Sequence, residues 1–356
     1  MKNSGNTILL IGDIAGLILS LFPHLFIPPF YFILINLLFL TITFINTLRK
    51  KNFRKLTIPE TVLLEHTYHI NAISISPDGR YLASCGGDNL SIIWNLAKKK
   101  VFLRIQEPSW VGNIAFSPDN QHLFTLVGKN GIFSTWETKK QTKLFSKVLE
   151  GGEYRGLAVS KDGHRVVVSN KNGSFYCFDP MDEKYYSMAV HISDTELRKV
   201  CFSNEKSFAI GNANGEVFLI DYSNSPNYTV KKIYGDVNHE VIRGIAFDST
   251  ERNLAITDSA GFLKIINIST QKVVSVKAHN GHAIAVVFSP NNKYIFTGGQ
   301  DNVICVWEYL SNEIKKVFEI IGHDDDVTSL AIDTKNKLYS AGRDNSIKIW
   351  NLKGLY

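Results

Sequence analysis

The sequence predicts an all-β body made of seven copies of one unit, preceded by an α-helical hairpin. Three observations lead to this prediction. Short segments rich in Ile, Val and aromatic residues alternate apolar and polar side chains, which is typical of half-buried strands. Gly, Asn and Asp separate these segments at regular intervals. An apolar run at residues 7–48 stands apart from the repeated pattern.

The last copy of the unit, residues 322–352, displays its parts most clearly. The alternating segment from Val327 to Ile332 predicts a first strand, and residues 338–341 and 346–350 predict a second and a third. Turn-forming residues separate the three. The sequence stops at Tyr356, so a fourth strand of this copy has to come from another part of the chain.

Six earlier copies precede this one at a spacing of roughly 42 residues. Their first strands lead into turns such as ISISPDG (residues 73–79) and IAFSPDN (residues 114–120). The third strands of the seven copies end at Trp94-Asn95, Trp136-Glu137, Phe178-Asp179, Ile220-Asp221, Ile266-Asn267, Trp307-Glu308 and Trp350-Asn351. A period of about 40–45 residues with this content resembles the WD40 repeat. The resemblance covers residues 57–356 and implies a seven-bladed β-propeller, with about one four-stranded blade per repeat.

Three copies carry residues that match the structural tetrad of this family, a buried hydrogen-bonded chain of His, Ser or Thr, Asp and Trp. These residues are His66, Ser84, Asp88, Trp94; His279, Thr297, Asp301, Trp307; and His323, Ser340, Asp344, Trp350. Recurrence in three copies favours a structural role over a catalytic triad. Repeat two has Glu107 and Lys129 at the His and Asp positions, and repeats three to five have Asn172, Asn214 and Gly261 in the turn. We expect these four blades to be softer.

The segment Thr57–Glu65 is strand-like but has no repeat of its own. In the family that the repeats resemble, an N-terminal segment commonly completes the last blade. This implies that residues 57–65 supply the missing strand and remove two exposed sheet edges. We therefore expect residues 57–356 to form the propeller and residues 1–56 to form a separate N-terminal part.

The N-terminal part predicts a membrane anchor. Between residues 7 and 48, Asp13 is the one charged residue, and the run is about twice the ~20 residues that one crossing requires. Pro23, Pro28 and Pro29 interrupt it. We expect two helices, at about residues 6–22 and 30–48. A full crossing and a hairpin that enters one leaflet and returns are both compatible with this pattern.

Basic residues flank both ends of the predicted hairpin. Lys2 precedes it, and the basic residues of the segment 49–55 that follows are Arg49, Lys50, Lys51, Arg54 and Lys55. The positive-inside rule then predicts a multi-pass membrane protein whose propeller faces the cytoplasm. The same basic segment is suited to contact with anionic lipid headgroups.

Charge and cysteine content limit the possible partners. Residues 1–56 hold +5 of the formal net charge of +6, which leaves the body nearly neutral and argues against a nucleic-acid partner. The four cysteines stand singly, as expected for reduced thiols in a cytosolic domain. No residue pattern of a phosphate-binding loop, a nucleophile elbow or a zinc protease is present. We expect no catalysis, no cofactor and no metal site.

The resemblance implies a binding surface at the narrow face of the propeller, at positions three and five residues after the repeat's His position. Candidates there are Trp110, Arg155, Arg198 and Arg243, with Lys171 beside them. Arginine forks suit carboxylate and phosphate groups, and tryptophan is a frequent interface anchor. These residues predict contact with an acidic or phosphorylated segment of a protein partner. In the alternative interpretation, Glu153 and Glu196 pair with the arginines and leave a neutral rim.

These observations together predict a membrane-tethered WD40 scaffold or adaptor for protein–protein interactions on the cytoplasmic side. The alternative function is a membrane-anchored, propeller-type guanine-nucleotide exchange factor for a small GTPase. An extended loop inserted in the first blades would favour exchange activity. The even spacing of the repeats argues against such a loop.

Overall fold

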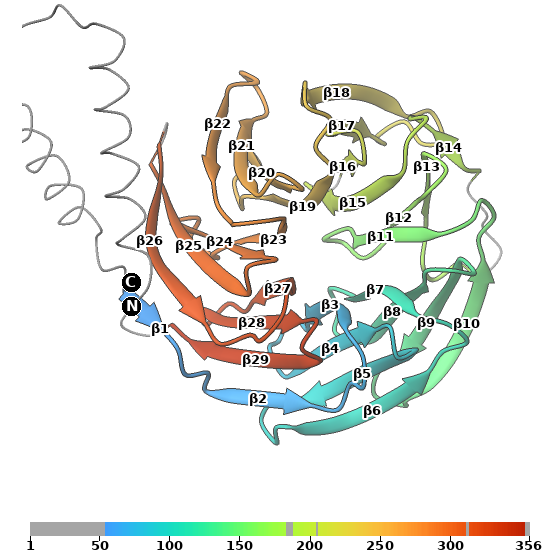
Figure 1. The fold of residues 1–356 in the computed structure, drawn as a ribbon. Coiled ribbons are helices and arrows are strands. Elements are labelled where there is room, and N and C mark those ends of the chain that lie inside the picture. The colour runs from blue at the N-terminus through green and yellow to red at the C-terminus, as the bar shows by residue number, and fades with distance from the viewer. Residues whose placement is uncertain (1–53, 183–187, 204–205, 311–312, 353–356) are drawn as a thin grey trace, which may run out of the picture. The chain divides into compact units, whose positions relative to one another are not determined.

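The computed structural model describes residues 54–182, 188–203, 206–310 and 313–352. Within these ranges the chain forms 29 β-strands and no helix. The strands make seven sheets arranged around a central channel (Figure 1). The predicted all-β, seven-bladed propeller is therefore confirmed.

The first four blades each contain four consecutive strands. Blade one consists of β3 (Ile70–Ile75), β4 (Tyr81–Gly86), β5 (Leu90–Asn95) and β6 (Lys100–Gln106). Blade two consists of β7 (Val111–Phe116), β8 (His122–Val127), β9 (Ile132–Glu137) and β10 (Thr142–Val148). Blade three consists of β11 (Tyr154–Val159), β12 (Val166–Asn170), β13 (Ser174–Phe178) and β14 (Val190–His191). Blade four consists of β15 (Leu197–Phe202), β16 (Ser207–Asn212), β17 (Glu216–Asp221) and β18 (Thr229–Gly235).

Blade five also contains four consecutive strands, whereas blades six and seven each include an N-terminal strand. Blade five consists of β19 (Ile242–Phe247), β20 (Asn253–Asp258), β21 (Phe262–Asn267) and β22 (Val273–Lys277). Blade six consists of β23 (Ala283–Phe288), β24 (Tyr294–Gly299), β25 (Val303–Leu310), β26 (Glu313–Ile321) and, at its edge, β1 (Arg54–Leu56). Blade seven consists of β27 (Val327–Ile332), β28 (Lys337–Gly342), β29 (Ser346–Asn351) and, outermost, β2 (Thr61–Leu64).

The hydrophobic core is divided among the seven junctions between blades. Each cluster of buried residues draws on two neighbouring blades, as where Phe133 of blade two meets Phe178 of blade three edge to face at 5.0 Å between ring centroids. The junction of blades seven and one has its own cluster, which includes Trp94 and Tyr339. Because a blade buries its faces only against its neighbours, stability depends on a closed ring.

Two N-terminal strands join the last two blades. β2 pairs antiparallel with β29, with Thr61 opposite Ile349 and Leu64 opposite Ser346. Its inward side chain, Leu63, is 4% exposed and packs in the cluster between blades seven and one. An extended edge strand was expected over residues 57–65, and the observed strand is the shorter segment β2.

The other N-terminal strand, β1, has no counterpart in the sequence prediction. It pairs parallel with β26, with Leu56 opposite Ile320. The compact unit that contains the propeller accordingly begins at Arg54, three residues before the predicted start at residue 57. Three residues beside a long neighbouring strand are too short a segment to show strand periodicity.

The predicted hairpin, with Arg49, Lys50 and Lys51, lies outside the described residues. Arg54 and Lys55 belong to β1. In the part of the chain that the structure describes, there is no helix with the length and apolar character that a membrane span requires.

Candidate functional site

The first structural tetrad is a continuous hydrogen-bonded chain in blade one. Nδ1 of His66 lies 2.8 Å from the Asp88 carboxylate, and Nε2 lies 2.8 Å from Oγ of Ser84. The indole N–H of Trp94 donates to the same Oγ at 2.8 Å. Because Ser84 accepts from Trp94, its own hydrogen is available for Nε2, which leaves the imidazole proton on Nδ1 facing Asp88.

Blades six and seven contain the same arrangement. His279 contacts Asp301 at 2.8 Å and Thr297 at 2.7 Å, and Trp307 donates to Thr297 at 2.9 Å. The corresponding distances for His323, Asp344, Ser340 and Trp350 in blade seven are 2.8, 2.7 and 2.8 Å. The three hydroxyl-bearing residues are fully buried. A substrate cannot reach these hydroxyl groups, so the arrangement suits cross-linking of strands rather than nucleophilic catalysis.

Blade two keeps this chain with a different residue at the His position. Glu107 is buried, and its Oε1 accepts a hydrogen bond of 2.8 Å from Oγ1 of Thr125. The indole of Trp136 donates to the same Oγ1 at 3.2 Å. Burial raises the pKa of the Glu107 carboxyl above its usual range. Lys129, at the Asp position, is exposed.

Blades three and four hold the corresponding turn with an asparagine that the sequence pattern did not single out. Oδ1 of Asn170 accepts from the backbone N–H groups of Asn172 and Ser174 at 3.1 and 2.9 Å. Oδ1 of Asn212 accepts from those of Asn214 and Glu216 at 3.0 and 2.8 Å. Asn172 and Asn214, the turn residues named by the pattern, therefore donate backbone hydrogen bonds, and the side chains of Asn170 and Asn212 accept them.

Blade five uses a buried ion pair at this position. Asp258 accepts from the N–H of Phe262 at 2.9 Å and lies 2.7 Å from Nζ of Lys264. The same ammonium group contacts Asp236. In blade five the ion pairs of Lys264 with Asp258 and Asp236 therefore stand in place of the hydrogen-bonded chain, although no repeat pattern marks Lys264.

A β-bulge recurs near the start of every innermost strand. The pairing register between the first two strands of each blade shifts at the same point, so one residue of the inner strand stands unpaired. Bulges turn a side chain away from the regular pleat. The seven bulge residues are Asn71, Gly112, Arg155, Arg198, Arg243, Ile284 and Thr328.

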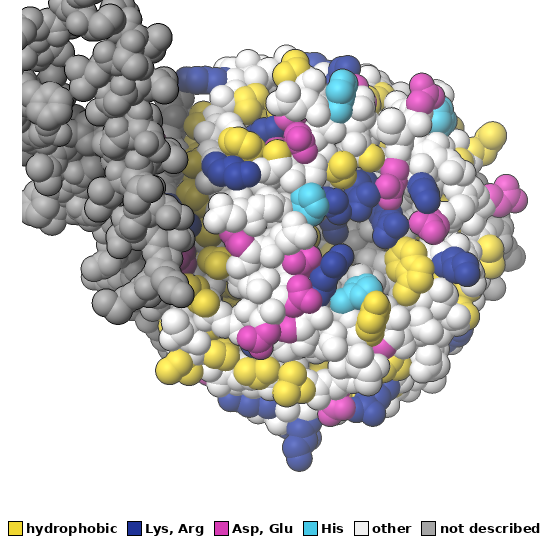
Figure 2. Space-filling view, viewed as in Figure 1, with side chains coloured by type: hydrophobic (Ala, Val, Ile, Leu, Met, Phe, Trp, Pro, Cys, Tyr) yellow, Lys and Arg dark blue, Asp and Glu magenta, His cyan; other side chains and the backbone are white. Residues whose placement is uncertain are grey.

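These seven residues line one cavity at the mouth of the channel. Trp110 and Lys199 complete its wall, and its volume is about 130 Å³. We call this cavity the rim pocket. Four of its lining residues are basic, and none of the described residues in the wall is acidic. Figure 2 shows this face, with basic side chains gathered around a hollow at the centre.

Two of the three predicted arginines are engaged by carboxylates just outside the wall. Glu196 lies 3.1 Å from Nε of Arg155 in the preceding blade and 2.9 Å from Arg198. Glu153 lies 3.4 Å from Arg155 and 3.8 Å from Lys171. Lys171 is therefore an exposed rim residue that does not line the pocket.

Trp110 is partly buried in this wall. The guanidinium carbon of Arg155 lies 5.2 Å from the centroid of the indole, within the range of a cation–π contact. A Cβ atom on Gly128 would come within 1.8 Å of the Trp110 ring. The ring thus packs closely against Gly128 and also contacts Arg155.

Two basic residues of the rim pocket, Arg243 and Lys199, form no ion pair with a carboxylate among the described residues, although Glu196 acts on Arg243 at longer range. Within the described part of the chain, Nε of Arg243 is buried and has no hydrogen-bond partner. Burial is the largest cause that lowers the pKa of Arg243, and repulsion from Arg198 is the second. Burial is the largest cause that lowers the pKa of Lys199 to about 8, and repulsion from Arg198 and, to a smaller extent, from Arg243 adds to it. No carboxylate among the described residues forms an ion pair with Lys199.

The sequence interpretation missed Lys199, although a signal for it exists. Lys199 directly follows the bulge residue of its blade. In the other six blades this position holds Ala72, Asn113, Gly156, Gly244, Ala285 and Ser329. A lysine in a column of small, uncharged residues is therefore exceptional, and only alignment of the seven bulges makes it visible.

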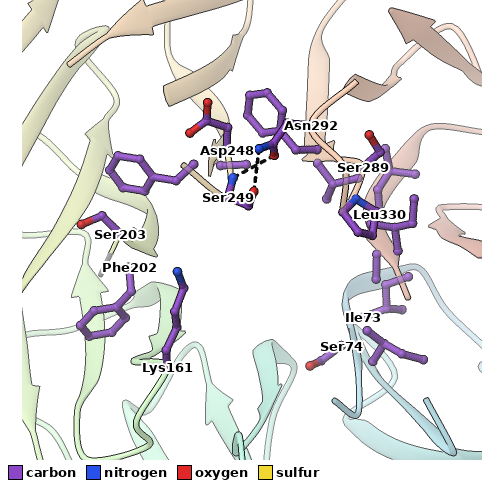
Figure 3. Close-up of a pocket in the computed structure, with 18 residues that line it drawn as sticks. Ile73, Ser74, Lys161, Phe202, Ser203, Asp248, Ser249, Ser289, Asn292 and Leu330 are labelled. Atoms are coloured by element: carbon purple, nitrogen blue, oxygen red, sulfur yellow. Dashed lines mark hydrogen bonds between the residues drawn. The ribbon is translucent and has the colours of Figure 1, made fainter. Parts of the chain in front are cut away.

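The opposite mouth of the channel has a larger cavity of about 500 Å³ (Figure 3). Most of its wall is apolar, with Ile73, Phe202 and Leu330 among its residues. Lys161 extends toward it, and Nζ of this residue lies 2.8 Å from a carboxylate oxygen of Glu251. The described residues at this mouth show no concentration of unbalanced charge. Among the described residues, no group of His, Cys, Asp and Glu is arranged to hold a metal ion.

The fold and its repeated chains define the class of protein: a seven-bladed β-propeller that contains WD40 repeats. Residues 58–95, 270–308 and 314–351 match the family described as "WD domain, G-beta repeat". These three segments are the repeats that contain complete tetrads.

Three curated relatives support this class. The chain is 23% identical over 271 residues to WD repeat-containing protein slp1 of Schizosaccharomyces pombe, which covers 73% of the chain and 54% of slp1. It is 27% identical over 314 residues to Actin-interacting protein 1 of Caenorhabditis elegans, and the match covers 81% of the chain and 47% of that protein. It is 22% identical over 314 residues to a Denticleless protein homolog of Danio rerio, and the match covers 82% of the chain and 46% of that protein. The chain spans about half the length of each.

Proposed function

We propose that this protein is a membrane-tethered scaffold whose propeller binds a protein partner through the rim pocket. The observation that carries this proposal is the composition of the pocket wall, with four basic residues, one tryptophan and no acidic residue among those described. Such a wall is complementary to an acidic or phosphorylated segment. Trp110 supplies the apolar anchor next to the charged groups.

Protein binding is supported by the class of fold and by the relatives. The printed name of Actin-interacting protein 1 refers to a protein partner. We transfer only the general property, binding of another protein, because identity is 27% and the match covers 47% of that relative. We expect the propeller to act without catalysis of its own.

The proposed tether rests on the sequence of residues 1–56. The apolar run with its central prolines supports a two-helix hairpin, and the basic residues at both ends support a cytoplasmic propeller. A hairpin of this kind would tether the propeller to a membrane. Lipid contact through the basic segment at residues 49–55 belongs to the same proposal.

Proximity labelling from the intact protein tests the binding proposal. The wild type is compared with an Arg155→Ala, Arg198→Ala, Arg243→Ala triple variant and with Lys161→Ala, which removes a basic residue at the opposite mouth. We expect the triple variant to lose a set of labelled proteins that Lys161→Ala retains. Thermal unfolding of all three proteins controls for folding.

A second variant separates charge from geometry. Lysine at the same three positions keeps the positive charge but loses the planar fork that binds two oxygens at once. We expect it to recover only part of the labelling. If the triple alanine variant captures the same proteins as the wild type, the rim pocket is not the partner site and the proposal fails.

A further inference from the structure

Positive charge in the rim pocket is concentrated on one side. Arg155 shares Glu196 with Arg198, and Glu153 provides a second carboxylate to Arg155. These contacts already satisfy much of the hydrogen-bonding capacity of Arg155. Lys199 and Arg243, on neighbouring inner strands, have no comparable carboxylate among the described residues. An anion in the pocket would therefore be attracted first toward Lys199 and Arg243, with Arg198, which shares Glu196 with Arg155, as the third cation of this side.

The surroundings of Lys199 strengthen this attraction. The charged groups that act on it are Arg198 from its own strand, Arg243 from β19 and Arg155 from β11. The Cys85 thiol of β4 also lies within electrostatic range, but it is buried and burial raises its pKa, so it stays uncharged. Like charges held together in a partly buried site are unfavourable until an anion neutralises them.

The size of the pocket limits what this anion can be. A volume of about 130 Å³ equals about four water molecules at ~30 Å³ each. One phosphoryl group fits such a space. The pocket opens at the centre of the face, next to the indole of Trp110, so a group projecting from a peptide can enter it.

We propose that Lys199, Arg198 and Arg243 form a binding site for a single phosphoryl group carried on a side chain of the partner. This inference rests on the proposed function and names its ligand as a phosphorylated rather than an acidic segment. A phosphoryl ester has a charge between −1.5 and −2 and three acceptor oxygens at neutral pH. It can therefore neutralise more of this three-cation site than a carboxylate with one charge and two oxygens.

Fluorescence polarisation with labelled peptides tests the site in the full chain. The probes are three degenerate heptapeptide pools that carry serine, aspartate or phosphoserine at the centre. Inorganic phosphate serves as a competitor. The proteins are the wild type, Lys199→Met, and Lys171→Met as a control that removes one positive charge from the same face outside the pocket.

We expect the phosphoserine pool to bind at least about tenfold more tightly than either other pool, because hydrogen bonds to charged groups have this strength. Lys199→Met should weaken that binding by about tenfold or more, and Lys171→Met by about twofold or less. A single cooperative unfolding transition at or above the wild-type midpoint establishes that a variant is folded. Equal binding of the phosphoserine and aspartate pools would overturn the proposal, as would full binding by Lys199→Met.

The inorganic phosphate arm identifies the source of the phosphoryl group. If phosphate binds in a Lys199-dependent manner and the phosphoserine pool does not, the site takes a free anion and the peptide assignment is wrong. If the phosphoserine pool binds through Lys199 but the arginine variants leave proximity labelling unchanged, the phosphoryl site stands and the proposed function fails.

Discussion

The guanidinium group of Arg155 lies over the indole of Trp110, with 5.2 Å between the guanidinium carbon and the ring centroid. The two residues come from neighbouring blades. Their contact places an aromatic surface and a fixed cation side by side at the wall of the rim pocket. Glu153 and Glu196 also form ion pairs with this guanidinium group, at 3.4 and 3.1 Å.

A methyl group at Gly128 should disturb this contact. In Gly128→Ala the new Cβ would fall 1.8 Å from the Trp110 ring, so the ring must move away from its position under Arg155. We expect the free energy of unfolding to fall by about 1–3 kcal/mol, as for other overpacked sites. Chemical denaturation measures this change. The cost should largely vanish in a Trp110→Ala background, and an equal cost in both backgrounds would show that Trp110 is not the obstacle.

The N-terminal strand β2 should contribute to stability mainly through one side chain. Leu63 is 4% exposed and Leu64 is 67% exposed, although they are neighbours in the same strand. We expect Leu63→Ala to lower the free energy of unfolding by about 2–5 kcal/mol, and Leu64→Ala by about 0.5 kcal/mol or less. Equal effects in denaturant titrations would contradict closure of the ring through β2. A chain shortened to begin at His69 should be less stable still.

The tetrad of blade seven should make stability depend on acid. Burial raises the pKa of Asp344, but hydrogen bonds from His323, Lys348 and Ser346 outweigh burial and hold it well below its usual range. A carboxyl with a lowered folded-state pKa stabilises the fold above its unfolded value of about 3.9, and this stabilisation is lost as the pH falls below that value.

Asp344→Asn should therefore lower the free energy of unfolding by about 1.5–3 kcal/mol at pH 7. The difference from the wild type should shrink steadily below about pH 4. Asp324→Asn, which alters an exposed carboxyl in the preceding loop, should behave like the wild type throughout. A difference for Asp344→Asn that is independent of pH would mean that the carboxylate charge is not what stabilises the blade.

Glu107 should show the opposite dependence on pH. Burial raises its pKa, so the folded protein favours the protonated carboxyl, and its contribution to stability declines as the pH rises above the unfolded value of about 4.3. Glu107→Gln retains an oxygen for the hydroxyl of Thr125 and removes the charge. We expect this variant to be more stable than the wild type at pH 7 and equal to it near pH 3. Urea denaturation at the two pH values makes the comparison.

Lys199 should destabilise the folded protein at neutral pH when no anion is bound. Its pKa is about 8 in the folded chain against 10.5 as the ordinary value, so the unfolded chain holds the proton more tightly. The penalty is fully present below about pH 8 and disappears above about pH 10.5. We expect Lys199→Met to raise the free energy of unfolding by about 1–3 kcal/mol at pH 7, because solvent screening at this partly exposed residue reduces the effect of the pKa shift.

The same comparison at pH 10.5 should show little difference between Lys199→Met and the wild type. Lys171→Met, at an exposed residue paired with Glu153, should leave stability unchanged at both pH values. A loss of stability in Lys199→Met at pH 7 would show that the ammonium group is already neutralised in the folded protein.

The sequence alone could predict the features that depend on short-range pattern. The repeat spacing identifies seven units, and alternation along Val327 to Ile332 identifies an inner strand because neighbouring side chains point to opposite faces. The residues of the tetrads lie within one repeat, so their spacing is visible in the chain. Trp110, Arg155, Arg198 and Arg243 could be assigned to one face because each occupies a fixed position in its repeat.

Features that depend on charge compensation between blades could not be predicted in this way. The alternative interpretation pairs Glu196 with an arginine of its own repeat, and the structure shows this contact with Arg198 together with a second one to Arg155 of the preceding blade. No motif in the sequence around Lys199 marks it as a site residue. Its isolation from carboxylates follows from the convergence of inner strands around the channel.

The sequence by itself determined that this protein is a ring of seven similar blades, because each repeat encodes its own strands, turns and internal hydrogen-bonded chain. Only the tertiary structure decided where the ring closes and where its charge remains unbalanced. β1 and β2 are too short for their sequences to show which strands they pair with. They pair with β26 and β29, which lie near the C-terminal end of the chain. The rim pocket likewise exists only when seven bulges meet at one channel mouth.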